Sequence, residues 1–198
     1  GNLVTMGTFH SICAKILRNE IHHLGYNKDF SIFDVQDQIS LLKVIFDKMG
    51  IPKNSVSPQE ARYQISLYKN KLMTPSSVKI KSNLVIEKTY AEIYNKYQKS
   101  LFKNNAVDFD DLLLLPLELF DKNQKVLEKY REIWQYVLVD EYQDTNKPQF
   151  MLIRLLAEKQ KQICVVGDDD QSIYGWRGAD IRNILDFEKT FKKCEVFK

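Results

Sequence analysis

Two apolar runs of this sequence end abruptly in acids, and these acids are the side chains best placed to do chemistry. Val137-Leu138-Val139 leads into Asp140-Glu141, and Val165-Val166-Gly167 leads into Asp168-Asp169-Asp170-Gln171. A continuous β-branched run is typical of a strand buried on both faces of a parallel sheet, and ligands of such sheets lie beyond the carboxyl ends of the strands. Two neighbouring strands that both end in acids therefore indicate a site for a divalent cation and phosphate.

The residue types suggest a task for each member of this site. Mg²⁺ takes one or two carboxylates together with phosphate oxygens and water, which makes Asp140 the candidate metal ligand. Asp140 and Glu141 point to opposite sides if strand geometry continues, so Glu141 is left to accept a proton from an attacking water. Gln171 offers a donor and an acceptor to a terminal phosphate. Arg177 either neutralises charge that develops there or pairs with one of the acids.

A loop with two aromatic residues follows the second acidic run. Tyr174 and Trp176 lie two positions apart between Gly-containing turns, where no helical spacing explains them. Aromatic side chains in such a loop stack on unpaired bases at roughly 1–3 kcal/mol per base. The alternative is that Trp176 packs into the core beneath the loop. If the rings bind bases, a phosphate sensor and a base stack are near neighbours in the sequence.

Composition narrows the class of protein. The 198 residues, 44% apolar and 28% charged, suit one full globular domain or two small ones, and no apolar run approaches the roughly 20 residues that span a bilayer. Three scattered cysteines argue against a disulfide framework or a zinc site and fit a reducing cytosol. Residues 11–105 hold 15 Lys and Arg against 8 Asp and Glu, and residues 106–198 hold 14 against 18. This asymmetry favours a polyanionic partner beside a cation site.

Periodicity predicts a sheet interrupted by helices. We expect strands over 3–6, 136–139, 162–166 and 194–197, with Cys164 as a small core residue. Helices are expected over 12–19, after the N-caps Asp34 and Ser57, over 86–101, from Asp108 onward, over 126–133, and after Asn146. Pro116 should bend or end the helix that contains it. The tyrosines of the apolar helical stripes are interpreted as packing residues.

Four segments match patterns that occur together in one protein family. Asp140-Glu141-Tyr142-Gln143-Asp144-Thr145 and the run 167–179 resemble motifs II and III of superfamily 1 DNA helicases of the UvrD/PcrA/Rep type. Thr8-Phe9-His10-Ser11 resembles motif Ib, and Asp108-Phe109-Asp110-Asp111-Leu112 resembles the acidic motif Id. The match to motif III is long and specific, and the motifs follow the family's order across nearly the whole chain.

The resemblance implies an α/β fold, a partial RecA-like parallel sheet of the P-loop NTPase type with a large all-helical insertion subdomain. Residues 1–10 and 134–198 would form parts of RecA-like domain 1A, and residues 11–133 the accessory subdomain 1B. ATP and Mg²⁺ would be the cofactors. Asp140 would hold Mg²⁺, Glu141 would be the general base, Gln171 would contact the γ-phosphate, and Arg177 would couple these groups to the DNA strand.

The resemblance also implies the partners. Single-stranded DNA and single/double-strand junctions would be the substrates of a cytoplasmic enzyme that moves 3′-to-5′. Tyr174 and Trp176 would line the single-strand path, and Thr8 and His10 would lie near its phosphates. No Gly-x-x-x-x-Gly-Lys-Ser/Thr occurs in these residues, and the family's second RecA-like domain has no counterpart here. We therefore expect a piece of a longer protein that by itself hydrolyses ATP negligibly and does not unwind DNA.

Two other functions fit parts of the sequence. A metal-dependent nuclease would place two ions about 3.5–4 Å apart among acids, with these as ligands: Asp108, Asp110, Asp111, Asp140 and residues 168–170. Gln171 would have no task in such a site. A non-enzymatic DNA-binding module would instead contact duplex phosphates through lysines that flank Pro75, namely Lys69, Lys71, Lys79 and Lys81.

Overall fold

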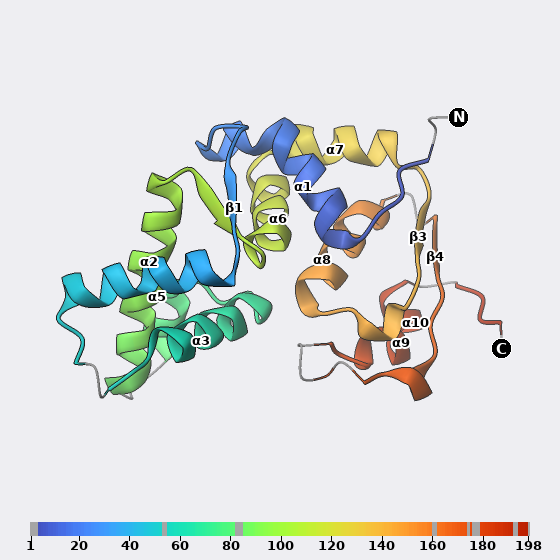
Figure 1. Cartoon of the computed structure of the whole chain (residues 1–198). Helices are drawn as coiled ribbons and strands as arrows, with labels where there is room; N and C mark the ends of the chain where they lie inside the picture. The colour runs from blue at the N-terminus through green and yellow to red at the C-terminus, as the bar shows by residue number, and fades with distance from the viewer. Residues whose placement is uncertain are drawn as a thin grey trace. The chain divides into compact units, whose positions relative to one another are not determined.

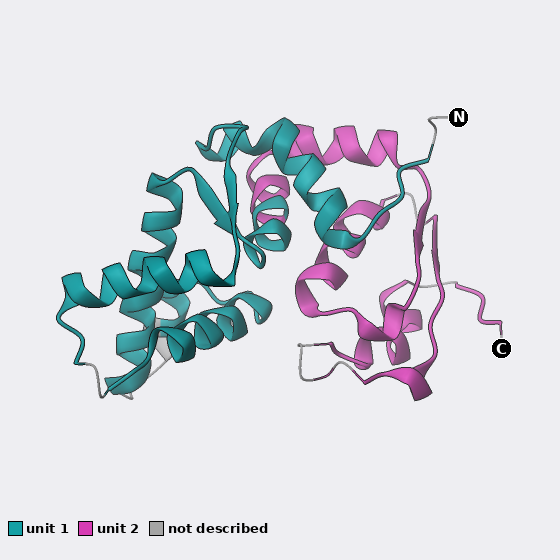
Figure 2. Cartoon of the chain, in the orientation of Figure 1, with its two compact units in different colours: residues 1–116 teal, residues 117–198 magenta. Residues whose placement is uncertain are grey.

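The chain folds into two compact units, residues 1–116 and 117–198, which are described separately (Figure 2). The computed structural model describes residues 4–52, 55–81, 85–159, 162–173, 175, 179–191 and 194–197, without the side chains of residues 79–81. Helix α6 (Asp111–Lys122) begins in the first unit and ends in the second. None of the described helices is both long and apolar enough to cross a membrane.

The first unit is mostly helical (Figure 1). A 3₁₀ turn (Ile21–Leu24) follows α1, and α2, α3 and α5 pack on one another, with α4 against α5. The helices of this unit before α6 have these bounds: α1 Phe9–Glu20, α2 Val35–Met49, α3 Pro58–Asn70, α4 Pro75–Lys81 and α5 Val85–Lys103.

Side-chain caps fix where the helices of this unit begin. The Asp34 carboxylate accepts hydrogen bonds from the backbone of Gln36 and Asp37 ahead of α2, and Ser57 caps α3 in the same reciprocal way with Glu60. These caps satisfy N–H groups that have no partner inside the helix, and they confirm two helix starts expected from the sequence. Thr8 caps α1 through Ser11, so this helix starts three residues before the expected position.

One parallel strand pair joins segments far apart in the sequence. β1 (Ser31–Phe33) pairs with β2 (Ala106–Asp108), with Ser31 opposite Ala106 and Phe33 opposite Asp108. Neither strand was expected, because three residues carry too little alternation to be distinguished from a loop. The pair places Asp108 at the buried end of β2, immediately before α6.

Two apolar clusters fill this unit. The larger one lies among α2, α3 and α5 and includes the aromatic rings of Tyr68, Tyr94 and Tyr97. The second lies between α1, β2 and the start of α6 and includes Leu17, Ile21 and Phe30. Tyr68 and Tyr97 are thus core residues, as their helical spacing indicated.

The second unit contains the strand–helix–strand segment expected from the sequence. β3 (Val137–Val139) and β4 (Ile163–Val165) pair in parallel, with Val137 opposite Ile163. The ladder continues past the strands, because Val166 N–H donates to the Val139 carbonyl at 2.8 Å. The helices of this unit are α7 Gln124–Ile133, α8 Lys147–Ala157, α9 Arg182–Leu185 and α10 Phe187–Thr190.

The expectation that β3 and β4 are buried on both faces is wrong for the described chain. The Leu138 side chain is 78% exposed and Cys164 is exposed, whereas Val139 is buried. With two strands and α8 packed on one side, the opposite face remains open to solvent. Cys164 is therefore not a core residue, although it lies in a strand as expected.

Three further expectations are corrected by the structure. Residues 4–6 and 194–197 form no strand, and Val4, Met6 and Phe197 are largely exposed because no described strand pairs with these segments. Pro116 lies inside α6, so the alternative in which this proline ends its helix is wrong. Proline removes one hydrogen bond from the helical ladder and crowds the carbonyl four residues earlier, and the burial of Leu112, Leu115 and Leu119 in the same helix offsets that cost.

Candidate functional site

The chain turns sharply where β3 ends. Glu141 has φ of 51°, a left-handed conformation that is unfavourable for a residue with a side chain. Its backbone N–H donates to the Asp140 carboxylate at 2.9 Å, and the buried Tyr142 begins a 3₁₀ turn (Tyr142–Asp144). The turn keeps the Asp140 and Glu141 carboxylates at the surface, beyond the carboxyl end of the strand.

Gln143 connects the two acidic segments. Its side-chain N–H donates to Glu141 Oε2 at 2.7 Å, and its carbonyl oxygen accepts from the backbone N–H of Asp168 at 3.0 Å. The side chain is almost fully buried, with 1% of the residue exposed. Buried amides that use both ends in hydrogen bonds fix the groups they contact, so Gln143 sets the position of Glu141 relative to the end of β4.

Gln171 joins the same hydrogen-bonded chain through Asp168. Asp168 Oδ2 accepts from Gln171 Nε2 at 2.7 Å, while Oδ1 accepts from the backbone of Asp170 at 3.0 Å and caps the 3₁₀ turn (Asp169–Gln171). Three residues were expected from the sequence to act in nucleotide chemistry and are described in the structure. The structure brings these three together: Asp140, Glu141 and Gln171. Arg177, Tyr174 and Trp176 lie outside the described residues.

Gln143, which links the two acidic segments, was not expected from the sequence to be a site residue. Gln143 follows the first acidic pair much as Gln171 follows the second acidic run, and that repeated order was the available signal. Burial and the neighbouring negative charge of Glu141 raise the pKa of Asp144, the residue that follows Gln143. Glutamine carries no charge, so it connects acids without adding to their mutual repulsion.

The donor atoms of this site suit magnesium. Asp140 presents an exposed carboxylate at the edge where β3 and β4 both end, and Mg²⁺ prefers carboxylate and phosphate oxygens. The described residues contain one group of three metal-binding side chains whose ligand atoms lie within 4.8 Å of one another: Glu20, His22 and His23. Its imidazoles suit zinc or copper rather than magnesium, and none of its members belongs to the acidic segments.

The nuclease ligands and the duplex-binding lysines proposed from the sequence are contradicted in part. Lys69 is buried, and its ammonium lies 2.6 Å from Asp108 Oδ2 and 2.7 Å from Asp111 Oδ1. Asp108 and Asp111 are therefore occupied by a lysine and closed to solvent, and Lys69 cannot reach a DNA phosphate. Lys71 is exposed, whereas the side chains of Lys79 and Lys81 lie outside the described ones.

The segment that resembles motif Ib lies at the start of α1. His10 is partly buried, and its ring stacks on Phe109 with centroids 4.0 Å apart and planes inclined by 22°. Burial lowers the pKa of His10, which favours the neutral form of its imidazole. Phe109, which the sequence analysis did not select, is 56% exposed.

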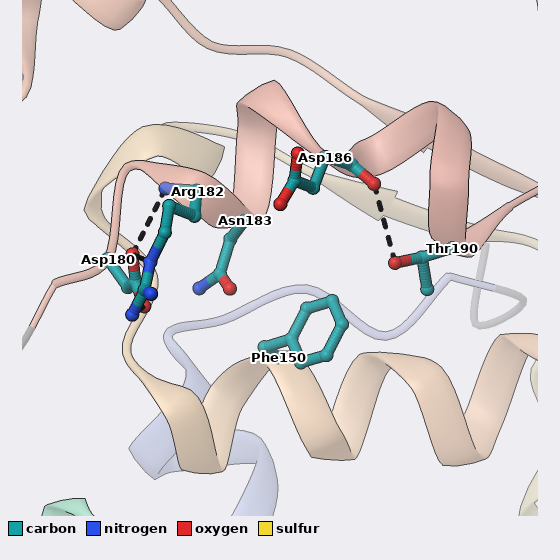
Figure 3. A pocket seen from close by; sticks show the side chains of 6 residues that line it. All are labelled: Phe150, Asp180, Arg182, Asn183, Asp186 and Thr190. Carbon is teal, nitrogen blue, oxygen red and sulfur yellow. Dashed lines mark hydrogen bonds and ion pairs between the residues drawn. The ribbon is translucent and has the colours of Figure 1, made fainter.

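A cavity of about 250 Å³ lies beside the segment that follows the second acidic run (Figure 3). Its walls come from α8, α9 and α10 and include the exposed Asp180–Arg182 ion pair. Asn183 in this wall donates to the Thr145 carbonyl at 2.9 Å, which anchors residues 179–183 beside the first acidic segment. The described residues assigned to nucleotide chemistry, Asp140, Glu141 and Gln171, do not line this cavity.

Comparison with known proteins identifies the family. Residues 2–192 match the family described as the UvrD/REP helicase N-terminal domain. The chain belongs to this family. The segments around Asp140 and Asp168 are thus parts of a UvrD/REP helicase N-terminal domain, which agrees with the resemblance of its four motifs.

Individual relatives give the same result. The chain is 44% identical over 193 residues to the ATP-dependent DNA helicase PcrA of Bacillus subtilis, covering 98% of this chain and 26% of the relative. It is 45% identical over 194 residues to the ATP-dependent DNA helicase PcrA of Staphylococcus aureus, covering 98% of this chain and 27% of the relative. This UvrD/REP-type chain therefore spans about a quarter of the length of the relatives it matches.

Proposed function

We propose that this chain supplies the magnesium-holding, water-activating and phosphate-sensing side of an ATP-dependent DNA helicase. The observation that carries the proposal is the hydrogen-bonded chain Glu141–Gln143–Asp168–Gln171, which joins the ends of β3 and β4. ATP-dependent DNA helicase is the name of relatives 44–45% identical to this chain. A fixed base and a fixed amide beside a triphosphate are what phosphoryl transfer to water requires.

Each residue has a separate task in this proposal. Asp140 would hold Mg²⁺, which when bound offsets the negative charge of the triphosphate. Glu141 accepts a proton from the attacking water, and Gln143 orients the Glu141 carboxylate through the 2.7 Å hydrogen bond. Gln171 contacts the γ-phosphate, and Arg177 couples the phosphate to the DNA-binding loop.

We propose that single-stranded DNA and its junctions with duplex bind to two groups of residues. Tyr174 and Trp176 stack on unpaired bases, and Thr8 and His10 contact phosphates near the start of α1. Phe109 joins the second group because its exposed ring stacks on His10. Stacking tolerates any base, which suits an enzyme that moves along DNA of arbitrary sequence, here in the 3′-to-5′ direction.

The proposed domain organisation follows the family pattern. Residues 1–10 and 134–198 would belong to a RecA-like domain 1A of the P-loop NTPase type, and residues 11–133 to a helical subdomain 1B. A second RecA-like domain and a phosphate-binding loop would come from the rest of a longer cytoplasmic protein. Because these 198 residues contain no Gly-x-x-x-x-Gly-Lys-Ser/Thr, we propose that the chain alone hydrolyses ATP negligibly.

The proposal is tested by Glu141→Gln in a full-length protein that contains this chain. We expect DNA-stimulated ATP turnover to fall by 100-fold or more, on the order expected for loss of a general base, with nucleotide binding preserved. Glu132→Gln, on the exposed surface of α7, is the matched control and should retain turnover. Near-normal turnover in Glu141→Gln would remove Glu141 as the base. Strand cleavage by the wild-type protein with Mg²⁺ alone would favour a nuclease.

A further inference from the structure

Lys69 on α3 is a buried lysine that none of the proposed chemistry uses. It is 0% exposed, and its ammonium contacts the carboxylates of Asp108 and Asp111 at 2.6 and 2.7 Å. Burial alone would lower the pKa of Lys69, but the two carboxylates outweigh burial and raise it, so the ammonium stays charged. Buried ion clusters are often no more stable than apolar side chains of the same size, so stability alone does not explain this one.

The cluster holds one short turn, residues 108–111, between β2 and α6. The Asp111 N–H donates to Asp108 Oδ1 at 2.9 Å, and the Asp108 N–H donates to Asp111 Oδ2 at 3.3 Å. From α5, the Tyr97 hydroxyl donates to Asp108 at 3.0 Å. From α3, the Asn70 amide donates to Asp110 at 3.1 Å. Three of the four residues in the turn are therefore fixed by side chains of α3 or α5.

Phe109 is the member of this turn that faces outward. Its neighbour Asp108 is buried and Asp110 is half-buried against Asn70, while the Phe109 ring is 56% exposed and stacks on His10 at a centroid distance of 4.0 Å. An exposed phenylalanine has few packing contacts that fix the position of its ring. Here the buried lysine fixes the backbone on both sides of the ring, and His10 supports one face.

We propose that Lys69 is a positioning residue for single-stranded DNA, because it holds the turn that presents Phe109 against His10. This inference rests on the proposed function, in which His10 and Phe109 contact the unpaired strand. The ligand is an unpaired base, recognised by stacking on an aromatic face. Lys69 itself does not touch DNA, since it is enclosed by Asp108, Asp111 and Tyr97.

The test is the affinity of this chain for a fluorescein-labelled oligo(dT), measured by anisotropy at constant ionic strength. Phe109→Ala should weaken binding by about 5- to 150-fold, the range for loss of one base stack. Lys69→Met should cause a loss of similar size, and no further loss when combined with Phe109→Ala. Lys96→Met, which removes one charge from the exposed surface of α5, is the matched control and should bind within about threefold of wild type.

Lys69→Met leaves two buried carboxylates without a cation and is at risk of unfolding. A second variant, Lys69→Met with Asp108→Asn and Asp111→Asn, removes all three charges and should restore the unfolding midpoint. We expect this variant to bind oligo(dT) as weakly as Phe109→Ala, and its His10 ring protons to lose the upfield NMR shift caused by the stacked phenylalanine.

The outcomes separate the inference from the proposed function. Wild-type affinity and an unchanged His10 shift in the folded triple variant would overturn the positioning role of Lys69. Wild-type affinity in both Phe109→Ala and His10→Ala would instead remove this surface from the proposed DNA path. Weak binding by Phe109→Ala together with normal binding by the triple variant would support the proposed DNA contact of Phe109 and would contradict only the positioning role of Lys69.

Discussion

Gly167 lies directly against Gln143. A Cβ atom added at position 167 would be 2.5 Å from Gln143 Oε1 and 3.2 Å from its backbone nitrogen. The glycine therefore allows the end of β4 to approach the amide that orients Glu141. Glycine is needed here because it has no side chain, which lets the backbone approach the buried Gln143, and not because of its conformational freedom.

We expect Gly167→Ala to destabilise the chain by roughly 1–3 kcal/mol, the usual cost of inserting a methyl group into a packed site. The measurement is the free energy of unfolding in urea. Gly175→Ala is the matched control, because no described atom lies within 4 Å of a Cβ added there, and it should change stability by less than about 0.5 kcal/mol. Equal effects of the two substitutions would show that Gln143 does not lie against Gly167.

The combination of Gly167→Ala with Gln143→Ala tests whether the two residues act on each other. Gln143→Ala alone should cost about 1–3 kcal/mol, because the Asp168 N–H loses a buried acceptor. Without the Gln143 amide there is room for most of the added methyl group. The double variant should therefore lose about 1 kcal/mol less unfolding free energy than the two single variants lose in sum. Simple additivity would indicate that Gly167→Ala clashes with Ile184 instead, whose side chain lies 2.9 Å from the added Cβ.

The stability of the chain should depend on pH through Asp111. Burial, together with the charge of Asp108, raises the pKa of Asp111 from 3.8 to about 7, against the opposing effect of Lys69. Between these two values the folded state holds a proton on Asp111 that the unfolded chain has released, so Asp111 accepts from the Lys69 ammonium as a neutral acid there and as a carboxylate above about pH 7. The free energy of unfolding therefore falls as pH rises through this window, by at most about 1.4 kcal/mol per pH unit for one proton.

Asp111→Asn removes the group that binds this proton, so the unfolding free energy of this variant should depend less on pH. Urea unfolding of the wild type and Asp111→Asn at pH 5, 6 and 7 gives the comparison, and the wild-type slope should be the more negative. Parallel slopes would mean that Lys69 keeps the Asp111 carboxylate ionised throughout this range. Asp186→Asn, an acid of the second unit that pairs with Lys189 at the surface, should leave the wild-type slope unchanged.

The open face of β3 predicts unequal effects of two identical substitutions. Leu138→Ala should change the stability of this chain by less than about 0.5 kcal/mol, because the side chain is 78% exposed. Leu152→Ala, in the buried face of α8, should cost about 2–5 kcal/mol. Thermal and urea unfolding measure both. A large loss from Leu138→Ala would indicate that this face is covered in solution by another segment or a second molecule.

Local hydrogen bonding made several elements predictable from the sequence. Asp34, Ser57 and Asn146 each cap a helix through a residue three positions away, and such contacts need no tertiary structure. The strand–helix–strand order around Asp140 and Asp168 followed from apolar runs that end in acids. These short-range signals located Asp140, Glu141 and Gln171 at neighbouring strand ends, although not the amide that connects them.

Contacts between distant segments were beyond the sequence. In the sequence Lys69 cannot be distinguished from an exposed lysine. It becomes a buried cation only because folding brings it to Asp108 and Asp111, which lie 39 and 42 positions further along the chain. The stack of His10 on Phe109 and the pairing of β1 with β2 also join segments that lie far apart in the sequence. The sequence by itself determined where helices start and where acids follow strands, because those depend on neighbours along the chain. The tertiary structure decided which charges face solvent and which side chains meet, because burial and long-range contact exist only after the chain has folded.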